Sequence, residues 1–146
     1  MERDEVIAVV NRFLEANCRA ARGEPVDPLA DLHDDLAWTM TGNTTVARTY
    51  SGLDDFRTNI GKAMSMQFRS GEGFGLNAVE YIVEGNRVAV VIKGRGEGFR
   101  GATYNNNYFF FIEVRDDKIF SVIESCDGSL VWRSACDTHL EESNGS

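Results

Sequence analysis

The sequence predicts an α+β domain, with helices in the N-terminal half and an antiparallel sheet in the C-terminal half. Apolar side chains recur at helical spacing in residues 2–22, whereas residues 74–125 form short β-rich runs separated by turns. Helices followed by a run of strands are typical of α+β domains. We assign residues 1–136 to one domain and expect the polar residues 137–146 to form a disordered tail.

Three helices and one strand are expected before the meander. Asp27 is a good N-cap and Pro28 suits a first helical position, so a short second helix is predicted to run to about His33. The expected helices cover residues 2–22, 28–33 and 51–66, and the strand covers residues 36–40. Residues 41–50 are polar and are expected to form a loop.

The C-terminal half is expected to contain strands over residues 74–83, 88–95, 104–115 and 118–125. The strand over residues 104–115 has aromatic side chains on both faces. One face carries Tyr104, Tyr108, Phe110, Ile112 and Val114, and the other carries Phe109 and Phe111. Because a solvated face should be largely polar, both faces are expected to be covered. Helices can cover one face, and the sequence predicts that a second copy of the chain covers the other, through Phe109 and Phe111.

Charge and hydropathy exclude several classes of partner. The chain has 15 basic and 23 acidic residues and a net charge of −8, which disfavours binding to nucleic acid or to anionic lipid. No apolar run reaches the roughly 18 residues that a membrane span requires. The charged N-terminus lacks a signal-peptide pattern, so a cytoplasmic location is expected. Neither the histidines nor the cysteines have metal-ligand spacing, and no metal site is predicted.

Several short motifs occur in an informative order. They are Trp38 and Gly42, then Tyr50-Ser51-Gly52 before a helix with Phe56, then Tyr104-Asn105-Asn106-Asn107-Tyr108, Asp117-Lys118-Ile119 and Glu124-Ser125-Cys126-Asp127. Over about residues 2–132 this order resembles the SnoaL-like branch of the nuclear transport factor 2 superfamily, which contains polyketide cyclases and is related to ketosteroid isomerase and limonene epoxide hydrolase. The resemblance implies a cone-shaped fold, in which a curved, mostly antiparallel sheet wraps around the helices and encloses a cavity. It also implies homodimers that form through the opposite sheet face.

The resemblance singles out Asp127 as the candidate catalytic residue, because the family pattern ends its last strand with an acid in the cavity. An apolar pocket raises the pKa of a carboxyl group and suits it to general acid–base catalysis. Strict alternation along the last strand places Ser125 and Asp127 on one face, and the resemblance implies that this face looks inward. The alternative is that Asp127 caps a turn with Gly128 and Ser129.

The candidate substrate-binding residues are Trp38, Met40, Tyr104, Asn106, Asn107, Tyr108 and Ser125. Asparagine and tyrosine can donate hydrogen bonds to a developing oxyanion, and by the resemblance the second acid of ketosteroid isomerase falls near Asn107 or Tyr108. A polar strand end with satisfied hydrogen bonds is the alternative for this group. Trp38 and Met40 are suited either to lining a cavity for a flat ligand or to an ordinary core.

Two functions remain open from the sequence. One is an enzyme without metal or organic cofactor that moves a proton alpha to a carbonyl of a hydrophobic, polyketide- or steroid-like compound. The other is a non-catalytic ligand-binding or dimerisation module. Lys93 and Arg95 lack the neighbouring acid found in epoxide hydrolases, and Met40 lies near the position of the ketosteroid isomerase base. Both of those particular reactions are therefore disfavoured.

Overall fold

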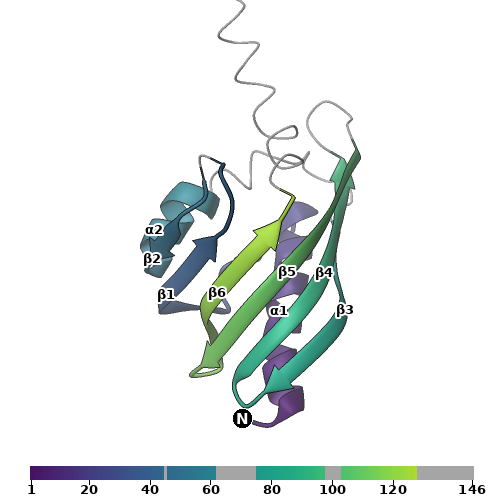
Figure 1. The fold of residues 1–146 in the computed structure, drawn as a ribbon. Helices are drawn as coiled ribbons and strands as arrows, with labels where there is room; N and C mark the ends of the chain where they lie inside the picture. Colours follow the sequence, from purple (N-terminus) through teal and green to yellow (C-terminus); the bar gives the residue numbers. More distant parts are fainter. Residues whose placement is uncertain (45, 62–74, 98–102, 128–146) are drawn as a thin grey trace, which may run out of the picture.

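The structure is a computed structural model that describes residues 1–44, 46–61, 75–97 and 103–127. Its elements are α1 (Arg3–Ala21), β1 (Leu32–Met40), β2 (Thr49–Ser51), α2 (Leu53–Phe56), the π-helical turn η1 (Arg57–Gly61), β3 (Gly75–Glu84), β4 (Arg87–Glu97), β5 (Thr103–Arg115) and β6 (Lys118–Cys126). The strands form one sheet in the order β2-β1-β6-β5-β4-β3 (Figure 1). Among the strand pairs that the structure describes, only β1–β6 is parallel. The predicted α+β class and mostly antiparallel sheet are confirmed.

Helix α1 lies across one face of the sheet, and α2 lies beside β1 and β2 (Figure 1). The N-terminus of α1 has a capping box, in which the Glu2 N–H donates to Glu5 Oε2 over 2.8 Å. The helix ends before Gly23, whose φ of 85° suits glycine. Its buried side chains recur at the predicted helical spacing and are Val6, Val9, Val10, Phe13, Leu14 and Asn17.

The core lies between α1 and the inward face of the central strands. Inward-facing residues of β4, β5 and β6 supply it, including Val88, Val90, Ile92, Phe110, Ile112, Val114, Ile119 and Val122. Each fully buried side chain of this size contributes roughly 1.5–3 kcal/mol. Phe109 and Phe111 are 56% and 46% exposed on the outer face, which confirms the predicted alternation of the aromatic strand.

A β-bulge changes the facing of residues in β6. Phe120 has no Cα partner on β5, because the pairing passes from Ile119 directly to Ser121. One extra residue reverses the side to which the following residues point. Glu124 is therefore 8% exposed and Ile123 is 50% exposed. The alternation predicted from the sequence is therefore wrong beyond the bulge. That prediction places on the inward face Ser121, Ile123, Ser125 and Asp127.

The predicted second helix is also wrong. Residues 28–31 form a turn, in which Asp27 Oδ1 accepts a hydrogen bond from the Leu29 N–H at 3.0 Å. The Asp31 carbonyl oxygen accepts from the Ile119 N–H at 2.8 Å, and Leu32 is already paired with β6. Pairing with β6 thus starts the strand before a helix can extend.

The other predicted elements differ from the structure at one helix and one loop. The predicted third helix corresponds to α2 and η1 as far as Gly61, and its last residues, 62–66, lie outside the described residues. The short strand β2 occupies a segment predicted to be a loop. The expected tail, residues 137–146, also lies outside the described part of the chain. Among the helices that the structure describes, none combines the length and apolar character that a bilayer span requires.

Candidate functional site

The centre of the candidate site is the buried carboxyl group of Glu124 on β6. At its level in the sheet, Glu124 is paired with Phe110 of β5 on one side and Met40 of β1 on the other. The indole Nε1–H of Trp38 donates to Glu124 Oε2 at 2.8 Å. Within the described residues this is the only hydrogen bond of the carboxyl group.

The surroundings of Glu124 change its acidity. Burial raises the pKa of Glu124 to about 7, against the opposing effect of the Trp38 hydrogen bond, which stabilises the carboxylate. A carboxyl group with a pKa near 7 is present as both acid and base at neutral pH. This is the protonation behaviour that a general acid–base catalyst requires.

Three aromatic rings hold the indole of Trp38, whose side chain is 3% exposed. Ring-centroid distances from Trp38 are 4.6 Å to Phe56 of α2, 5.5 Å to Phe110 and 5.9 Å to Phe13 of α1. The packing restricts the ring plane and so fixes the direction of the N–H group. Trp38 is thus a core residue and also a direct partner of the buried acid.

The backbone of Glu124 is anchored as well. Its carbonyl oxygen accepts from the Thr41 N–H at 3.0 Å and from Thr41 Oγ1 at 3.1 Å. Thr41 directly follows β1, so these two bonds join the β1 end to β6 at the level of the carboxyl group. Both the side chain and the main chain of Glu124 therefore have fixed positions.

Partly exposed inward side chains continue from Glu124 towards the ends of β5 and β6. Tyr108 and Cys126 are cross-strand partners there. The Tyr108 ring lies over Gly94, where an added Cβ would be 2.6 Å from Tyr108 Cε2. Burial, reinforced by the Glu124 charge, raises the pKa of the Cys126 thiol to about 12, so the thiol is protonated at neutral pH. These side chains give Glu124 a mixed aromatic and thiol neighbourhood.

The side-chain amide of Asn106 forms hydrogen bonds with the backbone of Asp127. The Asn106 side chain is 1% exposed. Its Oδ1 accepts from the Asp127 N–H at 3.1 Å, and its Nδ2 donates to the Asp127 carbonyl oxygen at 3.2 Å. The carboxamide thus takes the place of a backbone pair one residue beyond β6 and holds Asp127 beside β5.

Asp127 is exposed and follows the last residue of β6. It lines a shallow pocket of about 360 Å³ at the ends of β5 and β6, together with Asn105, Asn106, Asn107, Phe109, Ser125 and Cys126. Phe109 and Asn107 are on the outer sheet face, opposite Glu124. The catalytic role of Asp127 stays a prediction.

The structure divides the predicted site residues into two groups. Trp38, Met40 and Tyr108 lie on the inward face with Glu124, whereas Asn107 and Ser125 lie near Asp127. The Tyr104 side chain lies outside the described part of the structure. Among the described residues, no group of three or more histidine, cysteine or acidic side chains is placed to hold a metal ion.

The sequence reasoning missed Glu124, although Glu124 belongs to one of the motifs that it used. The usable signal was a charged residue two positions after Val122, in a strand otherwise rich in apolar residues. Strict alternation from Ile119 hid this signal, because it does not allow for the bulge at Phe120.

In its described residues, the protein is an α+β domain with a helix against one face of a mixed, six-stranded sheet and a carboxyl group buried on that face. The SnoaL-like domain family matches residues 10–122, and the chain belongs to this family. The match ends two residues before Glu124. A search of curated protein sequences gives no match.

Solved structures share the fold. An NTF2-like protein from Burkholderia xenovorans LB400 is 24% identical with a TM-score of 0.65, over 92% of this chain and 98% of that chain. TerC, co-crystallised with polyporic acid, is 18% identical with a TM-score of 0.69, over 90% and 98%. A putative SnoaL-like polyketide cyclase from Jannaschia sp. CCS1 is 12% identical with a TM-score of 0.68, over 92% and 96%. At these identities the similarity establishes the fold alone.

Proposed function

We propose that the protein binds a small hydrophobic carbonyl compound beside Glu124 and moves a proton at the carbon alpha to the carbonyl group. The observation that carries this proposal is the carboxyl group of Glu124, which is buried, has a pKa of about 7 and is oriented by the hydrogen bond from Trp38 Nε1. We expect no metal or organic cofactor in this reaction.

The two carboxyl oxygens have different surroundings. Oε2 accepts from Trp38, while Oε1 has no hydrogen-bond partner in the part of the chain that the structure describes. In the proposed step, Oε1 of the carboxylate takes the alpha proton, and the electrons of the C–H bond move into an enolate. Return of the proton to the same carbon gives hydrogen exchange, and its transfer to another carbon of the conjugated system gives an isomerisation. Attack of the enolate carbon on a second carbonyl group of the same molecule would form a C–C bond and give a cyclisation, in which the new alkoxide oxygen takes the proton from Glu124.

The neighbours of Glu124 support a flat, hydrophobic ligand. Trp38, Phe110 and Tyr108 lie on the same sheet face, and rings of this kind favour contact with planar apolar molecules. Among the structural relatives, one is a putative polyketide cyclase and another was crystallised with polyporic acid. Both names agree with a hydrophobic organic ligand for this chain.

Proton exchange tests the proposal without knowledge of the natural substrate. A panel of hydrophobic ketones and β-diketones in D₂O would be followed by NMR for protein-catalysed loss of the alpha proton. We expect Glu124→Gln to slow exchange by about 10²–10⁴-fold, as is typical for loss of a general acid–base group. The matched variant is Asp127→Asn, which we expect to retain the wild-type rate within a few-fold.

The other outcomes have definite meanings. Loss of exchange in Asp127→Asn but not in Glu124→Gln would assign the base to Asp127 and refute the proposal for Glu124. If the wild-type protein catalyses no exchange but binds polyporic acid in calorimetry, the non-catalytic ligand-binding function would replace the proposal.

We also propose that the protein forms homodimers, because the outer face of the sheet carries exposed apolar side chains. An apolar outer-face patch crosses three strands and consists of Ala89, Val91, Phe109, Phe111 and Ile123. Phe109, Phe111 and Ile123 are each about half exposed, and Ala89 and Val91 are cross-strand partners of the two phenylalanines. Burial of such a patch against the same patch of a second copy would form a two-fold interface.

A further inference from the structure

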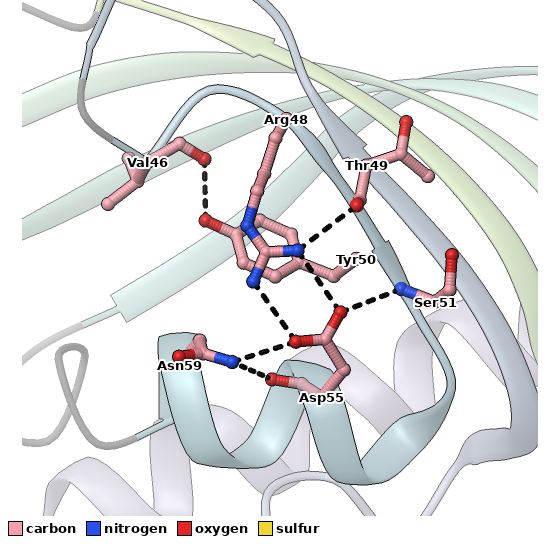
Figure 2. Close-up of polar contacts among 7 residues, drawn as sticks. All are labelled: Val46, Arg48, Thr49, Tyr50, Ser51, Asp55 and Asn59. Atoms are coloured by element: carbon pink, nitrogen blue, oxygen red, sulfur yellow. Dashed lines mark hydrogen bonds and ion pairs between the residues drawn. The ribbon is translucent and has the colours of Figure 1, made fainter.

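An ion-pair network beside the site joins α2 to β2 (Figure 2). The Arg48 guanidinium forms two hydrogen bonds to the Asp55 carboxylate, at 3.1 and 3.0 Å, and lies over the Tyr50 ring, 3.8 Å from its centroid. Asp55 also accepts from the Ser51 N–H at 3.0 Å and from Asn59 Nδ2 at 2.7 Å. We call these five residues the Arg48–Asp55 clamp.

Two aromatic residues bound Trp38 on its α2 and β2 side: Tyr50, which belongs to the clamp, and Phe56, which the Tyr50 ring contacts. Phe56 follows Asp55 directly, is 1% exposed and packs on Trp38 with an interplanar angle of 31°. Tyr50 is the cross-strand partner of Trp38, and its ring meets that of Phe56 at 88°. The Tyr50 hydroxyl donates to the Val46 carbonyl oxygen at 2.6 Å (Figure 2). This hydrogen bond and the Arg48 guanidinium over the ring together fix the tyrosine side chain.

Local helix stability does not account for the position of Phe56. Helix α2 has four residues and continues as a π-helical turn, and helices of this length are not stable by themselves. The Arg48 and Asp55 side chains are 46% and 29% exposed, and ion pairs with this exposure add little to global stability. We therefore expect the clamp to fix the positions of Phe56 and Tyr50 and to contribute little to the free energy of unfolding of the whole domain.

We propose that Arg48 and Asp55 are positioning residues: by fixing Phe56 and Tyr50, they hold the Trp38 indole N–H against Glu124 Oε2. This inference rests on the proposed function, since it assigns to the clamp the orientation of the donor for the proton-transferring group. Arg48 bonding to Asp55, together with the Ser51 N–H, lowers the pKa of Asp55 to about 2. The clamp thus stays charged across the neutral range in which Glu124 would act.

Trp38 fluorescence offers a direct measurement. The chain has two tryptophans, and a Trp132→Phe background leaves Trp38 as the sole reporter. Glu124 has an electrostatic effect on the titratable groups of Tyr50 and Cys126. Burial raises the pKa of Tyr50 from its ordinary value and raises that of Cys126 to about 12. A fluorescence transition near pH 7 that disappears in Glu124→Gln therefore reports the ionisation of Glu124.

The clamp variants should move this transition upwards. The Trp38 hydrogen bond lowers the pKa of Glu124, so we expect Asp55→Asn and Arg48→Met to raise the midpoint. The limit is about one to two pH units, the shift for complete loss of a hydrogen bond to a charged group. Arg48→Lys keeps the charge but loses the bidentate geometry, and should give a smaller rise.

Asp31→Asn is the matched control, because it also removes a negative charge that is paired with an arginine, in this case Arg12 at 3.0 Å. We expect its midpoint to equal that of the background protein. An unchanged midpoint in all clamp variants would overturn the positioning role, as would an equal shift in the control. A lower midpoint would also overturn it, since it would mean that the clamp excludes water. Absence of any transition near pH 7 in the background protein would instead count against the proposed function.

Discussion

Replacing Glu124 by glutamine should change how the stability of the protein depends on pH. Glutamine keeps the shape of the side chain and can still accept the hydrogen bond from Trp38 Nε1, but it cannot ionise. The comparison of the two proteins therefore isolates the free energy that ionisation of a buried carboxyl group costs the folded state.

The sign follows from the raised pKa of Glu124. Below pH 4.5 the group is protonated in both the folded and the unfolded chain, and ionisation has no effect. Between pH 4.5 and about 7 the unfolded chain ionises while the folded chain keeps its proton, so the free energy of unfolding falls as pH rises. Above about pH 7 both states are ionised and the loss is complete.

The magnitude is large for a single side chain. At about 1.4 kcal/mol per pKa unit, a rise from 4.5 to about 7 corresponds to about 3 kcal/mol. Typical domains have a total stability of roughly 5–15 kcal/mol, so this loss would be easy to measure. The buried acid therefore costs the protein stability at neutral pH, a cost that a purely structural residue would not require.

Urea unfolding of both proteins at intervals from pH 4.5 to pH 8 provides the assay. We expect the wild-type free energy of unfolding, relative to that of Glu124→Gln, to decrease by about 3 kcal/mol across this range. All other titrations are shared and cancel in the difference. Parallel curves for the two proteins would show that Glu124 has an ordinary pKa and would refute the reasoning from burial.

Three further predictions concern the assembly and the fold. The wild-type chain should have the mass of a dimer in light scattering at micromolar concentration and Phe111→Asp that of a monomer; a monomeric wild type would contradict the outer-face patch as an interface. Deletion of residues 1–22 should give insoluble protein, because α1 covers the inward face of the sheet, and a soluble, cooperatively unfolding product would disprove this. Gly94→Ala should cost about 1–3 kcal/mol in urea unfolding, since the new methyl group overlaps the Tyr108 ring; an unchanged transition would mean that the ring moves aside freely.

The features that the sequence determined are those set by neighbours along the chain. The helical spacing of apolar residues predicted α1, and the two aromatic faces of β5 were assigned correctly from Phe109, Phe110 and Phe111. Periods of 3.6 and 2 residues follow from backbone geometry alone, so they can be read without knowledge of the partners. The order of the motifs also led to the SnoaL-like family, which the comparison confirmed.

Only the tertiary structure decided which acid is buried. The bulge at Phe120 arises from the pairing of β6 with β5, and it turns Glu124 towards Trp38. A second long-range pairing, that of β1 with β6, converted the expected second helix into a turn, because Leu32 pairs with Ile119. Strand register depends on residues that are distant in sequence, and a shift of one residue exchanges the two faces of a strand. The identity of a buried residue beyond a bulge is therefore a property of the assembled sheet.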